Sequence, residues 1–277
     1  MTIRVAMAQM LVEGGRPDAN VARAVQCVEQ AAARGCHLVV LPECLDAGWT
    51  DPSARTLAQP IPGPHTERLA RAARQGGVFV AAGLVERAGA ALFNSAVLID
   101  PRGEILLVHR KINELDLAHD LYSIGDRLAV AHTPLGTIGL AICADNFPDS
   151  LAIGHVLARM GAQILVSPSA WAVEAGHDNA VAPYGELWRR AYGELCRLYD
   201  LHVVGVSHVG WLAAGPWKGR KVIGCSLAMG PGGVILAEGP YGHDAEALLT
   251  VDLAPRPPIG KGTLIAEALR ARGYHGP

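Results

Sequence analysis

The fold class is decided near the amino terminus, where the chain runs IRVAMA at 3–8, PDANVARAVQCVEQAAAR at 17–34 and HLVVL at 37–41. The two outer segments are short and apolar, as buried strands are. The middle segment repeats apolar residues at helical spacing and ends just before Gly35, a typical helix stop. A strand, a helix and a second strand in this order predict an α/β fold.

The same alternation continues along the chain, interrupted by hairpins. Further helices are predicted over His65–Gln75, Phe147–Gly161 and Tyr184–Asp200. Further strands are predicted over Val78–Leu84, Ser95–Asp100, Ile105–His109, Leu128–Thr133, Thr137–Ile142, Gln163–Ser167 and His202–Ser207, with three more inside Gly224–Asp252. We interpret this mixture as two mixed sheets packed together with helices outside, in a single domain over residues 1–277 that ends in a Pro/Gly-rich tail at 254–277.

Composition excludes several classes of protein. Half of the residues are hydrophobic and only 18% are charged, so the chain can bury a full core and is not intrinsically disordered. The net charge is −2 and no basic stripe is present, which argues against nucleic acid and anionic membranes as partners. No apolar run approaches the roughly 20 residues that span a bilayer, and no signal peptide is recognisable. We therefore expect a cytoplasmic protein.

The cysteines, histidines and glycines do not form metal or phosphate motifs. No pair of cysteines has the C-x-x-C spacing, and the histidines lack i, i+4 pairing with a carboxylate. The glycines match no phosphate-binding pattern. We expect reduced thiols, no metal and no cofactor.

Three chemically useful side chains each follow a predicted strand: Glu43, Lys111 and Cys143. A thiol becomes a strong nucleophile once a base accepts its proton and positive potential stabilises the thiolate. Glu43 is a candidate for the base and Lys111 for the positive charge. The helix predicted from Phe147 would add the favourable end of its dipole near Cys143.

The segments around these residues resemble the carbon–nitrogen hydrolase (nitrilase) superfamily. The resemblance covers most of the chain and rests on segments 8–9, 41–43, 109–112, 139–148, 161–171 and 224–227. It implies an αββα sandwich, usually paired into homodimers or larger homo-oligomers, with Glu43, Lys111 and Cys143 as a catalytic triad. It also implies an oxyanion held by Lys111 and the backbone amide of Ala144.

Many members of this superfamily carry a second glutamate several residues beyond the lysine. Near the usual position this chain has Ala118 and His119 instead, so we predict that Glu114 takes the role, with Asp120 as the next choice.

Four further residues lie in segments expected to border the nucleophile, and we predict that they contact substrate: Asn146, Phe147, Trp171 and Tyr122. For the aromatic residues among them, packing in the core is an equally weighted alternative. Trp188 and Tyr192 are four residues apart on a predicted helix and are interpreted as a packing or dimer stripe.

The predicted function is hydrolysis of a non-peptide C–N bond in a small amide through a thioester, since Cys143-Ala144-Asp145 resembles the amidase branches. Nitrile hydrolysis is the nearer alternative. The resemblance also disfavours hydrolysis of N-carbamoyl amino acids, because members of the superfamily with that activity tend to place arginines shortly after the cysteine, where this chain has Asn146-Phe147. If such compounds were the best substrates, carboxylate recognition would come from elsewhere, for example from Arg189, Arg190 or Arg197. A catalytically silent member that acts as an assembly or binding partner is the alternative of another class.

Overall fold

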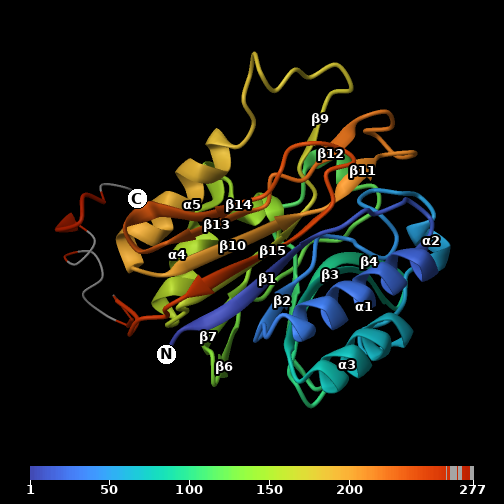
Figure 1. Cartoon of the computed structure of the whole chain (residues 1–277). Helices are drawn as coiled ribbons and strands as arrows, with labels where there is room; N and C mark the ends of the chain where they lie inside the picture. Colours follow the sequence, from blue (N-terminus) through green and yellow to red (C-terminus); the bar gives the residue numbers. More distant parts are fainter. Residues whose placement is uncertain (260, 263–266, 268–269, 275–277) are drawn as a thin grey trace.

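Two six-stranded sheets lie face to face at the centre of the molecule (Figure 1). The computed structural model describes residues 1–259, 261–262, 267 and 270–274. Helices α1 (Pro17–Ala33) and α3 (Pro64–Gly76) cover the outer face of one sheet, and α4 (Ala152–Arg159) and α5 (Glu186–Tyr199) cover the other. This arrangement is the predicted αββα sandwich, so the fold prediction is confirmed.

The first sheet combines a parallel centre with antiparallel edges. Its strands, in spatial order, are β15 (Ala247–Leu253), β1 (Ile3–Gln9), β2 (Leu38–Val40), β3 (Phe79–Ala88), β4 (Ala91–Ile99) and β5 (Ile105–Arg110). The outermost pair joins opposite ends of the chain, because β1 and β15 run antiparallel from Ile3 opposite Leu253 to Gln9 opposite Ala247.

The second sheet has the same plan. Its strands, in spatial order, are β14 (Val234–Glu238), β13 (Leu227–Gly230), β10 (His202–Ser207), β8 (Ile164–Ser169), β7 (Gly136–Leu140) and β6 (Val130–Thr133). A small third sheet consists of β11 (Val209–Trp211), β12 (Lys221–Ile223) and β9 (Ala172–Val173). A short helix, α2 (Ala54–Leu57), precedes α3.

Strand periodicity divides the core into layers. On β1, Val5 and Met7 pack between the two sheets, whereas Ala6 and Ala8 pack against the helices. Successive side chains of a strand point to opposite faces, so a strand buried on both faces is apolar throughout. The run IRVAMA has this property except at Arg4, which forms an exposed ion pair with Asp252.

The prediction that a helix begins at Phe147 is wrong. Cys143–Asn146 and Pro148–Ser150 are single 3-10 turns, and α4 begins only at Ala152. Proline disfavours helical geometry in the residue before it, and Phe147 is accordingly extended, with φ −63° and ψ 149°. The predicted dipole of a helix starting at Phe147 is therefore absent from the surroundings of Cys143.

A hairpin between β3 and β4 was not predicted. The strand expected to end at Leu84 continues to Ala88, turns at Gly89 and pairs along its length with β4. Gly89 has a φ of 62°, which glycine adopts without steric cost.

Residues 260, 263–266, 268–269 and 275–277 of the predicted tail lie outside the described residues. Among the described residues, no helix combines the length and apolar character needed to cross a membrane.

Candidate active site

Both sheets contribute to the candidate site. Glu43 lies three residues beyond the end of β2 and Lys111 directly follows β5, both in the first sheet, whereas Cys143 lies three residues beyond β7 in the second. The backbone amide of Glu43 donates a hydrogen bond to the carbonyl of Ser169 at the end of β8, with an N···O distance of 3.2 Å. The segment that carries Glu43 is thereby tied to the opposite sheet.

Glycine at position 83 lets the backbone pass close to Glu43. A Cβ atom on Gly83 would lie 2.6 Å from the Glu43 Cα and 2.8 Å from the Pro42 carbonyl oxygen. The Gly83 amide also donates to that carbonyl. Any larger residue would displace the segment that carries Glu43.

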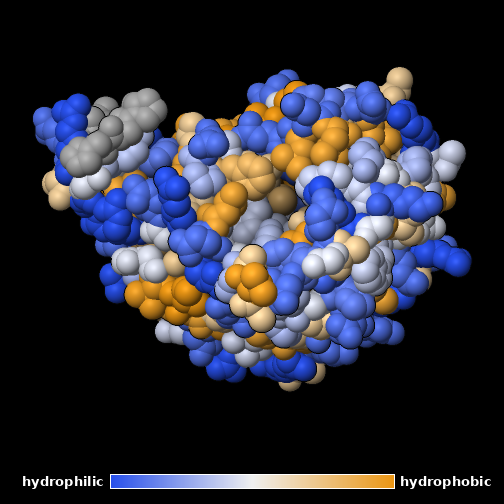
Figure 2. Space-filling view, turned by 90° about the horizontal axis from the view of Figure 1, so that it is seen from above, coloured by the Kyte–Doolittle hydropathy of each residue, from blue (hydrophilic) through white to orange (hydrophobic). Residues whose placement is uncertain are grey.

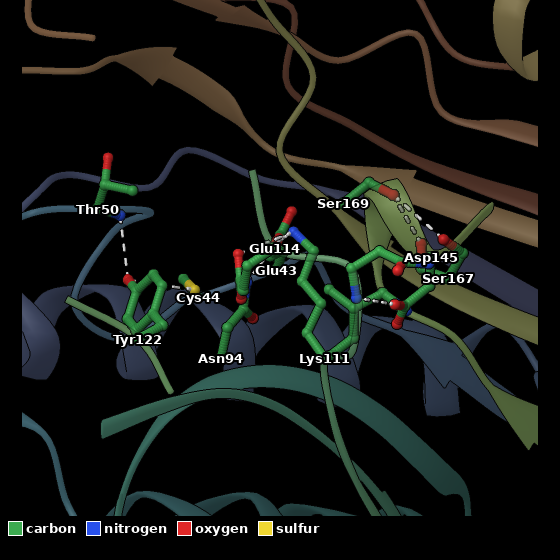
Figure 3. Close-up of polar contacts among 12 residues, drawn as sticks. Glu43, Cys44, Thr50, Asn94, Lys111, Glu114, Tyr122, Asp145, Ser167 and Ser169 are labelled. Carbon is green, nitrogen blue, oxygen red and sulfur yellow. Dashed lines mark hydrogen bonds and ion pairs between the residues drawn. The ribbon is translucent and has the colours of Figure 1, made fainter. Parts of the chain in front are cut away.

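A buried cluster of polar side chains surrounds Lys111 (Figure 3). Its Nζ lies 2.7 Å from Oε1 of Glu43 and 3.6 Å from Oε2 of Glu114. The side-chain amide of Asn94, on β4, donates to the same Oε1 of Glu43 at 2.6 Å. Oε2 of Glu43 is buried and accepts no hydrogen bond from the described residues. One carboxylate oxygen is thus fixed by two donors, and the other is free to accept a proton.

The charges of this cluster depend on one another. Burial lowers the pKa of Lys111, but the Glu43 and Glu114 carboxylates outweigh burial and hold the pKa well above its usual value. Burial, opposed by Lys111, raises the pKa of Glu114 to about 7. Burial and the Glu43 carboxylate raise the pKa of Cys143, and Lys111 offsets only part of this rise. A thiol that stays protonated at neutral pH needs a base as it attacks, and Glu43 is the neighbouring carboxylate.

A second buried carboxylate, Asp145, joins the segments that carry Lys111 and Cys143. Its Oδ1 accepts hydrogen bonds from the backbone amides of Ile112 and Asn113, at 3.1 and 2.8 Å. Its Oδ2 accepts from the backbone amide of Ile142 at 2.9 Å and lies 2.8 Å from Nε2 of His109. Burial raises the pKa of Asp145, but the His109 ring and these amides outweigh it and hold the pKa below its usual range.

The backbone at Cys143 is strained. Its φ is +42°, in the left-handed region that costs a residue with a side chain roughly 1–2 kcal/mol. Cys143 and Ala144 open a 3-10 turn, so their amide N–H groups have no acceptor within it. Such a sharp turn after a strand presents both a side chain and backbone donors to one place.

Glu43, Lys111 and Cys143 line one cavity of about 390 Å³. Most of the other residues on its wall are apolar or aromatic, and the exceptions are Glu186 and His177. The apolar and aromatic residues of the wall are Trp49, Leu115, Phe147, Ala170, Trp171, Ala172, Ala182, Pro183, Tyr184, Gly185, Leu187, Trp188 and Trp217. The loop that joins β9 to α5 supplies part of this wall and lies on the upper side of Figure 1. Figure 2 looks onto that side and shows a hollow bordered in part by hydrophobic surface.

The residues predicted to contact substrate divide into two groups. Phe147 and Trp171 lie on the cavity wall. Asn146 does not, because its amide donates to the Ala141 carbonyl at 3.2 Å and to Ser167 Oγ at 3.1 Å. Tyr122 packs in a separate hydrophobic cluster, where its hydroxyl accepts a hydrogen bond from the Thr50 amide at 3.0 Å.

The two candidates for the second carboxylate also separate. Glu114 is buried beside Lys111, whereas Asp120 is exposed. Geometry therefore favours Glu114.

The arginines considered for carboxylate recognition are engaged elsewhere. Arg189 forms an ion pair with Glu238, and Arg197 with Glu194. Arg190 lines a different surface pocket, beside His155.

Sequence reasoning did not identify Asn94, Asp145 or three of the four tryptophans of the cavity, Trp49, Trp188 and Trp217, as functional candidates. Asn94 lies in the middle of an apolar strand, and a buried polar residue there is a signal that could have been used. Trp188 was interpreted as packing, and it both packs in the core and lines the cavity. Trp49 and Trp217 are far apart in sequence, so only the fold reveals that their ring centroids lie 5.0 Å apart.

The sequence is similar to a known protein family and to several known proteins. Residues 4–256 match the family model described as carbon–nitrogen hydrolase. The chain is 31% identical over 183 residues to an omega-amidase NIT2 from Xenopus tropicalis, an alignment that covers 62% of this chain and 65% of the frog protein. It is 31% identical over 258 residues to a nitrilase from Pyrococcus abyssi, which covers 91% of this chain and 90% of that protein.

Solved structures show the same fold. A carbon–nitrogen hydrolase from Helicobacter pylori G27 aligns with a TM-score of 0.79 at 23% identity, covering 91% of this chain and 88% of that one. An amidase from Nesterenkonia sp. AN1, described with acrylamide added to its active-site cysteine, aligns with a TM-score of 0.75 at 23% identity over 91% of this chain and 93% of that one. Because the family model spans nearly the whole chain, this protein belongs to the carbon–nitrogen hydrolase family.

Proposed function

We propose that this protein hydrolyses the C–N bond of a small amide, with Cys143 as the nucleophile and a thioester as the intermediate. The observation that carries the proposal is the convergence of a thiol, a carboxylate with one free oxygen and a buried ammonium on one cavity. The names of the relatives support it, since they include omega-amidases and an amidase with a modified active-site cysteine.

Acylation begins when Cys143 attacks the amide carbonyl carbon and its proton moves to the free Oε2 of Glu43. The resulting oxyanion is stabilised by the Lys111 ammonium and the Ala144 amide. Glu43 then donates the proton to the departing nitrogen, the C–N bond breaks and ammonia or an amine leaves. Proton transfer of this kind contributes about 10²–10⁴-fold, and one oxyanion donor about 10²–10³-fold.

Deacylation repeats these steps with water. Glu43 accepts a proton from the water that attacks the thioester, and the carboxylic acid departs as the Cys143 thiol regains a proton. Glu43 therefore begins and ends each half-reaction ionised. Asn94 supports this role by holding the other carboxylate oxygen, Oε1, in place.

The test measures ammonia release from a panel of amides, nitriles and N-carbamoyl amino acids, together with the mass of the intact protein after rapid quenching. We expect turnover of amides and an acyl increment on the peptide that contains Cys143. Cys143→Ala should abolish both signals. Cys225→Ala is the matched control. Cys225 also has a positive φ, +57°, and it is not among the described residues that line the cavity.

Three results would count against the proposal. Hydrolysis that persists in Cys143→Ala would exclude the thioester. Turnover of nitriles alone would favour the alternative that the Pyrococcus relative suggests. A protein that hydrolyses no member of the panel and forms no adduct would support a catalytically silent role.

A further inference from the structure

We infer that the acyl group accepted by this site is uncharged and bulky, of the arylalkyl class, and that monoamides of dicarboxylic acids are disfavoured. The inference rests on the proposed amide hydrolysis and concerns the part of the substrate that does not react. It is drawn from the walls of the cavity that contains Cys143.

Aromatic rings dominate these walls. Six aromatic side chains line the cavity: Trp49, Phe147, Trp171, Tyr184, Trp188 and Trp217. They form two groups that hold one another in place. Trp171 and Trp188 stack with centroids 4.7 Å apart, and Phe147 lies 5.3 Å from Trp188.

The second group consists of Trp49 and Trp217, with centroids 5.0 Å apart and planes inclined by 59°. Aromatic rings prefer offset or edge-to-face contacts with centroids about 4.5–7 Å apart, as in both groups of wall residues. A phenyl group that enters the cavity can make the same contacts.

Charged groups on the walls do not favour an anion. Apart from Lys111, which the Glu43 and Glu114 carboxylates flank, no lysine or arginine lines the described wall of the cavity. Glu186 does line it, and this residue is exposed. A second carboxylate on the substrate would gain no cationic partner and would lie near a residue of like charge.

The cations close to the cavity are already paired. Arg189 binds Glu238, and Arg220 binds Glu174 while its guanidinium lies 4.0 Å from the centre of the Trp217 ring. Lys221 donates to the carbonyl of His177 at 3.0 Å. Recruiting any of them to a substrate carboxylate would break an existing contact.

The size of the cavity agrees with this class. Its volume of about 390 Å³ falls within the roughly 300–1,000 Å³ typical of small-molecule sites, well beyond the needs of a two- or three-carbon amide. Burial of one phenyl group against apolar walls should raise kcat/KM by about 10- to 100-fold.

The experiment compares three substrates that share one reacting end: propanamide, 3-phenylpropanamide and succinamate, which carries a carboxylate where the second has its ring. We expect kcat/KM for 3-phenylpropanamide to exceed that for propanamide by about 10- to 100-fold, and succinamate to fall below propanamide. The readout is ammonia release at pH 7.

Variants of two tryptophans test whether the preference arises in the cavity. Trp217→Ala should reduce the ratio of kcat/KM for 3-phenylpropanamide over propanamide by about tenfold, and Trp217→Phe should restore most of it. Trp211→Ala is the matched control, because Trp211 is an exposed tryptophan whose ring is tilted by 58° against that of His243, and it is not among the described residues of the cavity wall. It should leave the ratio unchanged.

A separate binding measurement keeps the inference testable without turnover. With Cys143→Ala protein, 3-phenylpropanamide should quench tryptophan fluorescence at lower concentration than either other amide. Preference for succinamate, or equal kcat/KM for all three amides, would overturn the inference and leave the proposed function standing. Failure of the wild-type protein to hydrolyse any of the three would instead refute the proposed function.

Discussion

Replacing Asp145 by asparagine should cost this protein about 3–5 kcal/mol of folding free energy. The carboxylate accepts three backbone hydrogen bonds and contacts His109, all within 3.1 Å and all buried. An asparagine oxygen can replace Oδ1, but its NH₂ group then faces the Ile142 amide, a donor against a donor. Hydrogen bonds to a charged group contribute about 1.5–3 kcal/mol each, and breaking a buried pair on one side costs about 3–5 kcal/mol.

The assay is urea denaturation of wild-type and Asp145→Asn protein at pH 7, followed by circular dichroism. Asp149→Asn serves as the control, because Asp149 is an exposed carboxylate four residues away. It should change the free energy of unfolding by less than about 0.5 kcal/mol.

The pH dependence of this difference has a definite sign. The pKa of Asp145 is held below its usual range in the fold, so its contribution is present near neutrality and is lost as pH falls through the folded-state pKa. The gap between wild type and Asp145→Asn should therefore narrow in acid. A loss below about 1 kcal/mol at pH 7 would refute the idea that this carboxylate joins the two segments.

Three further outcomes concern the reacting groups. Lys111→Met should lower kcat by at least about 10²-fold through loss of an oxyanion donor, and a rate near that of wild type would remove Lys111 from the mechanism. Glu114→Gln should reduce amide turnover, and its stability relative to wild type should rise with pH. The pKa of Glu114 is about 7 in the fold and roughly 4.3 in the unfolded chain, so protonated Glu114 contributes up to about 3–4 kcal/mol of stability to the wild type, and this contribution is lost as pH rises through 7. Denaturation of both proteins at pH 5 and pH 8 checks this, and an equal dependence on pH would contradict it. The free energy of unfolding of Cys143→Gly should exceed that of Cys143→Ala by about 1 kcal/mol, since glycine adopts the positive φ without steric cost. If denaturation shows the alanine variant to be equally or more stable, the backbone at this position stores no strain.

Sequence periodicity predicts most of this fold because its elements are strongly marked. The strand His202–Ser207 is observed with its predicted bounds, and the helix predicted over Pro17–Arg34 differs by one residue. Errors arise where one residue overrides the pattern. Pro148 prevents the helix expected at Phe147, and Gly89 allows a tight turn between β3 and β4 in a segment for which no strand was predicted.

The site was less accessible to sequence reasoning. Glu43, Lys111 and Cys143 each follow a strand and could be selected for their chemistry. Their convergence depends on the packing of two sheets, which periodicity does not specify. Asp145 is adjacent to the nucleophile, but its role depends on contacts with residues more than thirty positions away.

During translation, one edge of β1 stays unpaired until nearly the whole described chain has been made. Strand Ile3–Gln9 emerges early, whereas its partner Ala247–Leu253 is translated near the end of the described chain. At about 5–20 residues per second, one edge of β1 stays unpaired for roughly 10–50 s. An open apolar edge invites pairing between nascent chains, and a charged residue on such an edge opposes it. Arg4 lies on this strand and later forms an ion pair with Asp252 on β15. The same charged residue therefore opposes intermolecular pairing of β1 before β15 is made and favours the correct register of β1 with β15 afterwards.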